Sequence, residues 1–129
     1  MPSSTAPIKV FLADDSALIC DRVASLLTDA GMAVVGRGHS PRTCSDAILA
    51  TRPDVVVLDV QLEGGSGLEV LRTVRRAAPE VAFVVFSSNS GTAYRRRYLA
   101  QGAAAFFDKS TEFGKLAPGV ARAAATAVH

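Results

Sequence analysis

Short apolar runs alternate with longer amphipathic segments along the chain, and this alternation constrains the fold more than any other feature. The apolar runs fall at residues 8–13, 32–37, 54–59, 81–87 and 104–107. The amphipathic segments follow them at residues 16–30, 41–51, 66–77, 92–101 and 112–128. Strands and helices that alternate in this way are typical of a parallel sheet covered by helices. The length of 129 residues fits one such domain.

Two of the apolar runs are almost uninterrupted, which indicates their place in the expected sheet. Residues 55–58 are Val-Val-Val-Leu, and residues 81–86 are Val-Ala-Phe-Val-Val-Phe. A strand with helices on both of its faces carries apolar side chains at every position, whereas a half-exposed strand alternates. We therefore expect these two strands to lie deepest in the sheet.

The longer segments carry apolar side chains at steps of three and four residues, as helices with one buried face do. In the first and third segments these side chains are Ile19, Val23, Leu26, Leu27, Ala30, Leu68, Leu71 and Val74. Gly31 and Pro79 are expected to end these two helices. Tyr94 and Tyr98 share a face of the fourth helix, which either covers the sheet or lines an outer surface.

The last segment is less regular because Pro118 lies inside it. A helix that continued through this proline would lose about 3 kcal/mol. We expect either a kink at Pro118 or a short first turn followed by a second piece that begins with Pro118.

The charge balance argues against a protein that binds nucleic acid directly. Fourteen Lys and Arg against twelve Asp and Glu give a net charge of +2, far from a strongly basic chain. The run Arg95–Arg97 forms no single patch, because successive helical residues point about 100° apart. We expect these arginines on a solvated surface that faces a protein partner.

The two cysteines, Cys20 and Cys44, lie in separate segments without the spacing of a metal or redox motif. We expect two buried thiols, no disulfide and a cytoplasmic protein. Residues 1–7 read as a short polar leader, and no run approaches the roughly 18 apolar residues of a membrane span.

The residues that close the expected strands are charged or polar. Asp14 and Asp15 follow the first strand, Asp59 closes the third, Ser87 closes the fourth, and Lys109 follows the fifth. In an open parallel sheet these positions meet at the edge where ligands bind. Three carboxylates in one crevice repel one another unless a cation neutralises them.

The chemistry of these side chains favours Mg2+ and phosphoryl transfer. Mg2+ keeps several waters and binds through one or two carboxylates, whereas zinc prefers His and Cys ligands that this motif lacks. A lysine beside the metal stabilises the oxygens of a transferring phosphoryl group. An aspartate can be the nucleophile and form an acyl phosphate.

Five separated features agree in order and spacing with one known family. They are the acidic pair within residues 10–16, the motif at 54–62, the turn at 65–69, Ser87, and residues 106–110. In these features the chain resembles the receiver domain of a two-component response regulator. The resemblance implies a flavodoxin-like, doubly wound (βα)5 α/β fold, with a five-stranded parallel sheet in the order 2-1-3-4-5 and helices on both faces. It places the receiver domain at residues 8–129, after a flexible leader at residues 1–7.

The resemblance also implies a phosphoacceptor and a Mg2+ site. Asp59 would accept the phosphoryl group. Asp15 would bind Mg2+ directly and Asp14 mainly through water. Asp59 itself and the backbone carbonyl of Gln61 would complete the protein ligands.

Further positions would respond to the phosphoryl group. Ser87 and Lys109 would contact its oxygens, and Phe106 would follow Ser87 inward as the aromatic switch. Gln61 and Asn89 would tune the attacking water and so the lifetime of the phosphorylated state. The family often has a switch tyrosine, so Phe106 lacks a hydroxyl that relatives use, and Leu-Glu at residues 62–63 replaces a common Met-Pro.

The expected function is that of a stand-alone receiver in a phosphorelay. It would take a phosphoryl group from the phosphohistidine of a sensor histidine kinase or a histidine phosphotransfer protein, in a Mg2+-dependent step that it partly catalyses itself. The change would reach the surface made by the helix at 92–101, the strand at 104–107 and the helix at 112–128. That surface would bind a downstream protein or a second copy of the chain, with no direct part for nucleic acid or membrane.

Other interpretations of the same residues remain open at this point. A pseudo-receiver would use the fold as an interaction module without phosphorylation, and an FMN-binding redox protein would share the topology but lacks a phosphate loop after the first strand. Taken alone, the acidic pair Asp14–Asp15 is interpreted as a helix cap. Taken alone, Lys109 is interpreted as a solvated loop residue. Residues 87–90 are interpreted as a plain turn. Residues 64–67 read as a flexible loop in which Ser66 caps the third helix.

Overall fold

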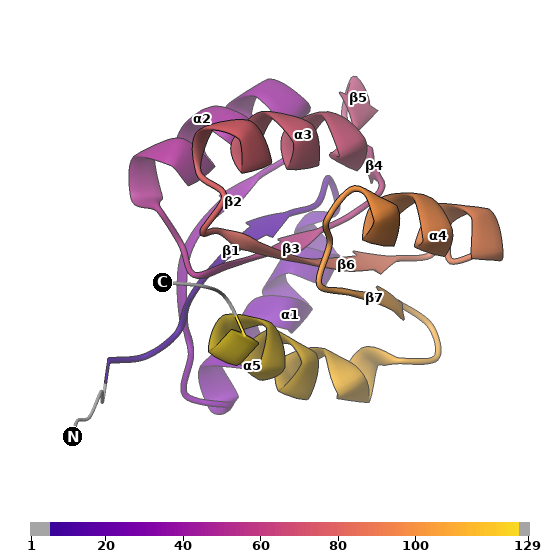
Figure 1. Cartoon of the computed structure of the whole chain (residues 1–129). Helices are drawn as coiled ribbons and strands as arrows, with labels where there is room; N and C mark the ends of the chain where they lie inside the picture. Colours follow the sequence, from indigo (N-terminus) through magenta and orange to yellow (C-terminus); the bar gives the residue numbers. More distant parts are fainter. Residues whose placement is uncertain (1–5, 127–129) are drawn as a thin grey trace.

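A five-stranded parallel sheet forms the middle layer of the computed structural model, which describes residues 6–126 (Figure 1). Its strands are β1 (Lys9–Ala13), β2 (Ala33–Gly38), β3 (Val55–Leu58), β6 (Ala82–Ser87) and β7 (Ala105–Asp108). They lie in the order β2-β1-β3-β6-β7. The intervening β4 (Gln61–Leu62) and β5 (Gly65–Ser66) form a separate antiparallel hairpin. Counted without this hairpin, the strands of the main sheet have the order 2-1-3-4-5 that the resemblance implies. The predicted fold class is confirmed.

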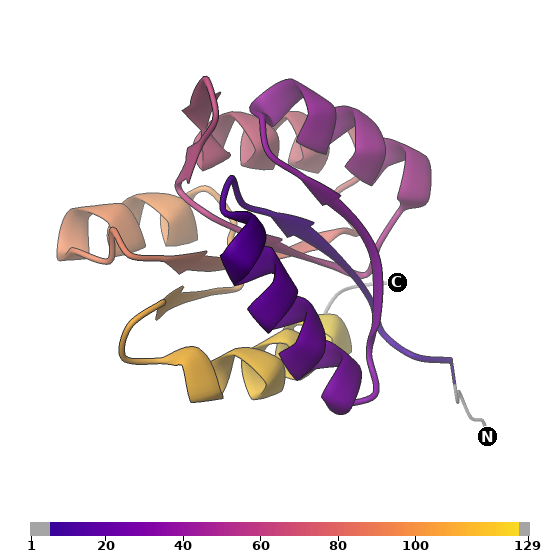
Figure 2. The ribbon, with the colours of Figure 1, turned by 180° about the vertical axis from the view of Figure 1, so that it is seen from behind.

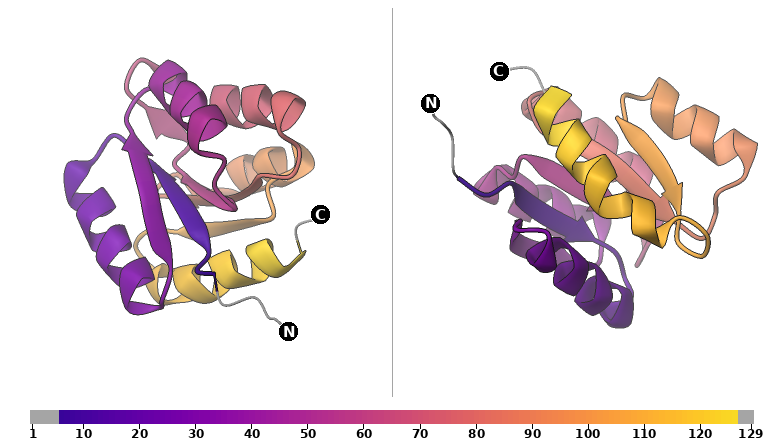
Figure 3. Two further views of the ribbon diagram at one scale, coloured as in Figure 1. Left: turned by 90° about the vertical axis from the view of Figure 1, so that its left-hand side faces the viewer. Right: turned by 90° about the horizontal axis from the view of Figure 1, so that it is seen from below.

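Helices cover both faces of the sheet, as in other doubly wound folds. They are α1 (Ala17–Asp29), α2 (Pro41–Thr51), α3 (Gly67–Ala77), α4 (Thr92–Ala100), the short 3-10 turn η1 (Phe113–Lys115) and α5 (Leu116–Thr126). The helices α2 and α3 lie on one face, and α1 and α5 lie together on the other (Figure 2; Figure 3, right). The bounds of α1 to α4 and of the five strands of the main sheet agree with the sequence prediction to within one residue at each end.

The core has two parts because neighbouring residues of a strand face opposite sides of the sheet. Phe11 and Phe83 pack on the side of α2 and α3, whereas Leu12 and Phe86 pack on the side of α1 and α5. Every residue of β3 is buried, as its apolar sequence predicts. Cys20 and Cys44 are buried and free, so the expectation of isolated thiols holds.

Two details of the helix predictions need correction. In α1 the buried side chains are Cys20, Val23 and Leu27, whereas Ala30, predicted as part of the apolar stripe, is exposed. The segment 64–67 is not simply a flexible loop, since part of it pairs in the β4–β5 hairpin. Ser66 is the N-cap residue of α3, as predicted, and its N–H donates to the Glu69 carboxylate at 2.8 Å. The Glu69 side chain therefore caps the start of this helix.

The last segment is divided into two helical pieces, as one of the two alternatives predicts, but the second piece begins two residues before Pro118. The 3-10 turn η1 precedes α5, and Pro118 is the third residue of α5 instead of the first. The N–H groups of a first helical turn have no partner within the helix, so proline costs no hydrogen bond there. The predicted end at Val128 lies outside the described residues, and within those residues no helix is long and apolar enough to cross a membrane.

The helix α4 lies beside β7 at the edge of the sheet and is the least embedded helix (Figure 1). Of its residues, all of which the structure describes, Tyr98 is the buried one, with 3% of its surface exposed. Tyr94 is 46% exposed, so the two tyrosines do not share one environment. Arg96 and Arg97 are exposed and Arg95 is half-buried, as expected for residues that point around a helix.

Gly67, the first residue of α3, packs against the backbone of Asp59, which follows β3. We predict that Gly67→Ala destabilises the protein. A Cβ atom at this position would lie 2.1 Å from the backbone oxygen of Asp59. Overpacking of this kind costs about 1–3 kcal/mol, which urea unfolding would measure. The matched control is Gly114→Ala, because a Cβ there meets nothing within 4 Å. Equal stability of the two variants would contradict the close packing.

Candidate functional site

Three carboxylates meet at the carboxyl edge of the central strands. Asp14 and Asp15 follow β1 and Asp59 follows β3, and these two strands pair in parallel up to Ala13 and Leu58. Each aspartate offers one oxygen, and the three oxygens lie within 4.8 Å of one another. Asp14 and Asp59 are buried, whereas Asp15 is exposed. The fold thus brings the predicted acidic residues together in one partly open cluster.

Lys109 reaches this cluster from the end of β7. Its Nζ lies 2.6 Å from Asp14 Oδ2 and 2.9 Å from Asp59 Oδ2, and only 11% of its side chain is exposed. Burial alone would lower the pKa of Lys109, but its hydrogen bonds to the two carboxylates outweigh burial and raise the pKa. Lys109 is therefore not a solvated loop residue.

One ammonium group cannot neutralise three carboxylates. Burial raises the pKa of Asp14 and the charge of Asp59 adds to this effect, while Lys109 and the N–H of Ser16 oppose it. An additional cation at the exposed Asp15 side would relieve the remaining repulsion. The donors are carboxylate oxygens with one side open to water, which suits a hard ion that keeps part of its hydration shell, such as Mg2+.

The hydrogen bonds of the two buried aspartates fix their orientation. Asp59 Oδ1 accepts from the N–H of Val60 at 2.7 Å, so Oδ2 is the atom that faces Lys109. Asp14 Oδ1 accepts from the N–H of Ser16 at 2.9 Å. The cap of α1 is Ser16, whose hydroxyl accepts from the N–H of Ile19. The acidic pair is thus not itself the helix cap.

Sequence reasoning missed two residues beside the cluster. His39 Nδ1 lies 3.0 Å from the backbone oxygen of Asp14, and the thiol of Cys20 donates to the same oxygen at 3.7 Å. His39 directly follows β2, whose carboxyl end meets the same sheet edge, so its position after a strand was a usable signal. Both residues hold the backbone of Asp14 and leave its carboxylate free for Lys109.

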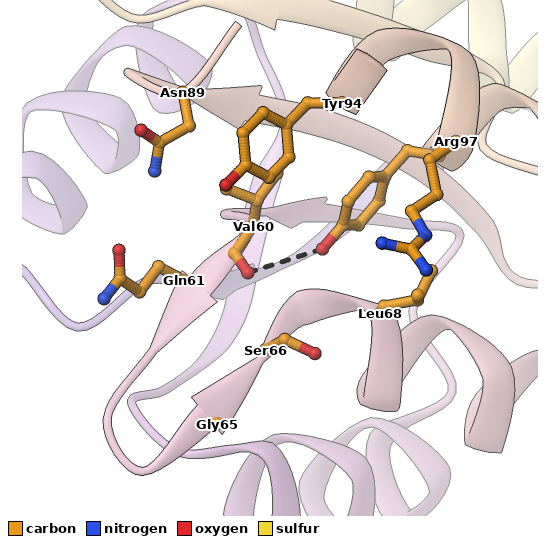
Figure 4. A pocket seen from close by; sticks show the side chains of 9 residues that line it. Val60, Gln61, Gly65, Ser66, Leu68, Asn89, Tyr94 and Arg97 are labelled. Atoms are coloured by element: carbon orange, nitrogen blue, oxygen red, sulfur yellow. Dashed lines mark hydrogen bonds between the residues drawn. The ribbon is translucent and has the colours of Figure 1, made fainter. Parts of the chain in front are cut away.

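The remaining predicted residues lie at the end of β6, beside α4 and in β7. Ser87 closes β6 and is fully buried, and its Oγ accepts from the N–H of Asn89 at 3.0 Å. Gln61 and Asn89 line a pocket of about 340 Å3 between the β4–β5 hairpin and α4 (Figure 4). Phe106 is 5% exposed and lies against the ring of Tyr98.

Because Lys109 compensates two buried charges, we predict that Lys109→Met destabilises the metal-free protein. Removal of one partner from a buried ion pair costs about 3 kcal/mol or more, measurable by urea unfolding at pH 7 in a chelator. The control is Lys115→Met, whose side chain is 68% exposed and pairs with Glu112 at 3.5 Å. An exposed pair contributes less than about 1 kcal/mol. Similar losses in the two variants would contradict the assigned role of Lys109.

Comparisons with known proteins agree with this geometry. The family model of the response regulator receiver domain matches residues 10–120. The response regulator GacA of Pseudomonas aeruginosa is 32% identical over 103 residues, which cover 79% of this chain and 48% of that protein. Protein-glutamate methylesterase/protein-glutamine glutaminase 1 of Geobacter metallireducens is 38% identical over 112 residues, covering 82% of this chain and 30% of that protein. The chain thus spans about half or less of these curated relatives.

Solved structures show the same arrangement. The signal receiver domain of NarL from Mycobacterium tuberculosis superposes with a TM-score of 0.86 at 27% identity, over 93% of this chain and 98% of that one. The response regulator domain of Thermotoga maritima CheB gives a TM-score of 0.80 at 25% identity, over 95% and 96%. The match of the family model over most of the length, together with these relatives, shows that the chain belongs to the response regulator receiver domain family.

Proposed function

We propose that the protein accepts a phosphoryl group on Asp59 from the phosphohistidine of a sensor histidine kinase or a histidine phosphotransfer protein. The observation that carries this proposal is the buried contact of Lys109 with both Asp14 and Asp59, beside the exposed Asp15. A scaffold that only binds partners gains nothing from three clustered carboxylates, since they repel one another. We assign residues 8–129 to this receiver domain.

The transfer uses Asp59 as the nucleophile. A carboxylate oxygen attacks phosphorus while the bond between phosphorus and the imidazole nitrogen breaks, and the nitrogen keeps the electron pair and takes up a proton as needed. Lys109, already beside Asp59 Oδ2, pairs with a phosphoryl oxygen. Asp15, Asp59, the backbone carbonyl of Gln61 and, through water, Asp14 would hold Mg2+, which would supply further positive charge to the transferring group.

The proposed output is a changed protein surface made of α4, β7 and α5. Ser87 turns its hydroxyl toward the phosphoryl group and Phe106 follows, which is a two-state element biased by a local charge. Gln61 and Asn89 border the pocket next to the acceptor and orient the water that removes the phosphoryl group. The surface binds a downstream protein or a second copy of the chain in the cytoplasm, where free thiols such as Cys20 persist.

The acceptor assignment predicts a single phosphoryl adduct after incubation with acetyl phosphate and Mg2+, measured by intact mass. Asp59→Asn is expected to remove the adduct because the nucleophilic carboxylate is lost. Asp54→Asn is the matched control, since Asp54 lies at the opposite end of β3 and accepts from the N–H of Lys9. An unchanged adduct in Asp59→Asn would contradict the assignment.

The metal assignment predicts that Mg2+ raises the thermal stability of the unmodified protein. A ligand that binds the folded state at ten times its Kd stabilises it by about 1.4 kcal/mol. Asp15→Asn is expected to abolish this gain and, because Asp15 is exposed, to leave the fold intact. Asp46→Asn, an exposed position on α2, is the control and keeps the gain. If Mg2+ leaves the melting temperature of the wild-type protein unchanged, a pseudo-receiver becomes the better description.

A further inference from the structure

Tyr98 connects the loop after Asp59 with the outer helix α4. Its hydroxyl donates to the backbone oxygen of Val60 at 3.3 Å, drawn as the dashed line in Figure 4. Only 3% of its surface is exposed, and burial raises its pKa to about 12, so the hydroxyl remains a donor at neutral pH. The loop and the helix are 38 residues apart along the chain.

Both backbone polar groups of Val60 are hydrogen-bonded. Its N–H donates to Asp59 Oδ1 at 2.7 Å, and its backbone oxygen accepts from Gly67 at 2.9 Å as well as from Tyr98. A phosphoryl group on Asp59 changes the charge and the hydrogen bonds of that carboxylate. The hydrogen bond from the N–H of Val60 to Asp59 changes with it, and the backbone oxygen of the same residue accepts from Tyr98.

The ring of Tyr98 packs against Phe106 of β7, on the side of the α4–β7 surface. It meets Phe106 edge to face, with ring centroids 6.1 Å apart and planes at 74°. The guanidinium of Arg95 lies over the Phe106 ring at 5.2 Å, and it also donates to the backbone oxygen of Phe106 and to Glu112 Oε1. A displacement of the Tyr98 ring therefore reaches β7 and the segment before α5.

We propose that Tyr98 is a positioning residue that couples the state of Asp59 to the α4–β7 surface through its hydroxyl bond to Val60. Phe106, at the switch position, has no hydroxyl, so the polar link between the acceptor loop and the aromatic pair comes from α4. This inference rests on the proposed function, because it needs a phosphoryl group on Asp59. Tyr98 is the buried side chain of α4 and borders the 340 Å3 pocket, so the helix has space to move with it.

The hydroxyl is separable from the packing role of the ring. The Val60 oxygen keeps the Gly67 N–H as a partner when the hydroxyl is removed, so no buried acceptor is left without a hydrogen bond. Tyr98→Phe therefore keeps the ring, its contact with Phe106 and the fold. Tyr94→Phe is the matched control, since Tyr94 is on the same helix and lines the same pocket but is 46% exposed.

The test follows backbone amide NMR shifts in the wild-type protein and both variants, before and after addition of Mg2+ and beryllofluoride, a mimic of the phosphoryl group. In the wild type we expect shifts at residues 59–62 and 87–89 and also at residues 92–100. In Tyr98→Phe the first two sets are expected to persist, while the shifts at residues 92–100 fall about threefold or more. Tyr94→Phe is expected to behave as the wild type.

The outcomes separate the two proposals. If Tyr98→Phe passes the change to residues 92–100 as fully as the wild type, the inference is overturned while the acceptor assignment stands. If Tyr98→Phe loses the shifts at residues 59–62 together with thermal stability, the role of Tyr98 is one of packing and the inference is likewise overturned. If the wild type responds nowhere and gains no phosphoryl adduct, the proposed function fails and the inference fails with it.

Discussion

The repulsion among Asp14, Asp15 and Asp59 is the constraint on which the rest of the site depends. A parallel sheet places the ends of β1 and β3 side by side, so the carboxylates that follow them cannot separate. Lys109, which follows β7, compensates part of this charge through its contacts with Asp14 and Asp59. The remaining negative charge, on the open side at Asp15, favours a cation there, and the proposed phosphoryl transfer to Asp59 would use that cation.

The fold separates a rigid part from a responsive part. The strands β1 and β3 are buried almost throughout and hold the carboxylates in place. The helix α4 instead contacts the body of the protein through few groups, chiefly the buried Tyr98 and the half-buried Arg95. Elements with few buried contacts are the ones that change conformation at low cost. Under the proposed function, a charge added at Asp59 would therefore move α4 more easily than the strands that hold the carboxylates.

Apolar periodicity predicts the strands and helices, and the residues that follow parallel strands predict the acidic cluster. The order of the strands in the sheet comes instead from the resemblance to receiver domains. The sequence does not predict the β4–β5 hairpin, since two-residue strands carry no periodicity. A break in the last segment was one of two alternatives, but the start of α5 at Leu116, after the η1 turn, was not predicted. Tyr94 and Tyr98 are alike in sequence, and only the packing of α4 against β7 decides which one is buried. Contacts with backbone oxygens, such as those of His39 and Tyr98, follow from loop geometry that a linear pattern does not carry.

A crystal structure of the protein with Mg2+ and beryllofluoride tests the central claim most directly. We expect one metal ion bound by Asp15, Asp59 and the backbone carbonyl of Gln61. We expect beryllium to bond to a carboxylate oxygen of Asp59, with its fluorides in contact with Lys109 and Ser87. We also expect that Lys109 leaves Asp14, since the ion takes over the compensation of that charge. A structure in which the carboxylate cluster binds no ion and Asp59 carries no beryllofluoride, with the contacts of Lys109 unchanged, would contradict the account.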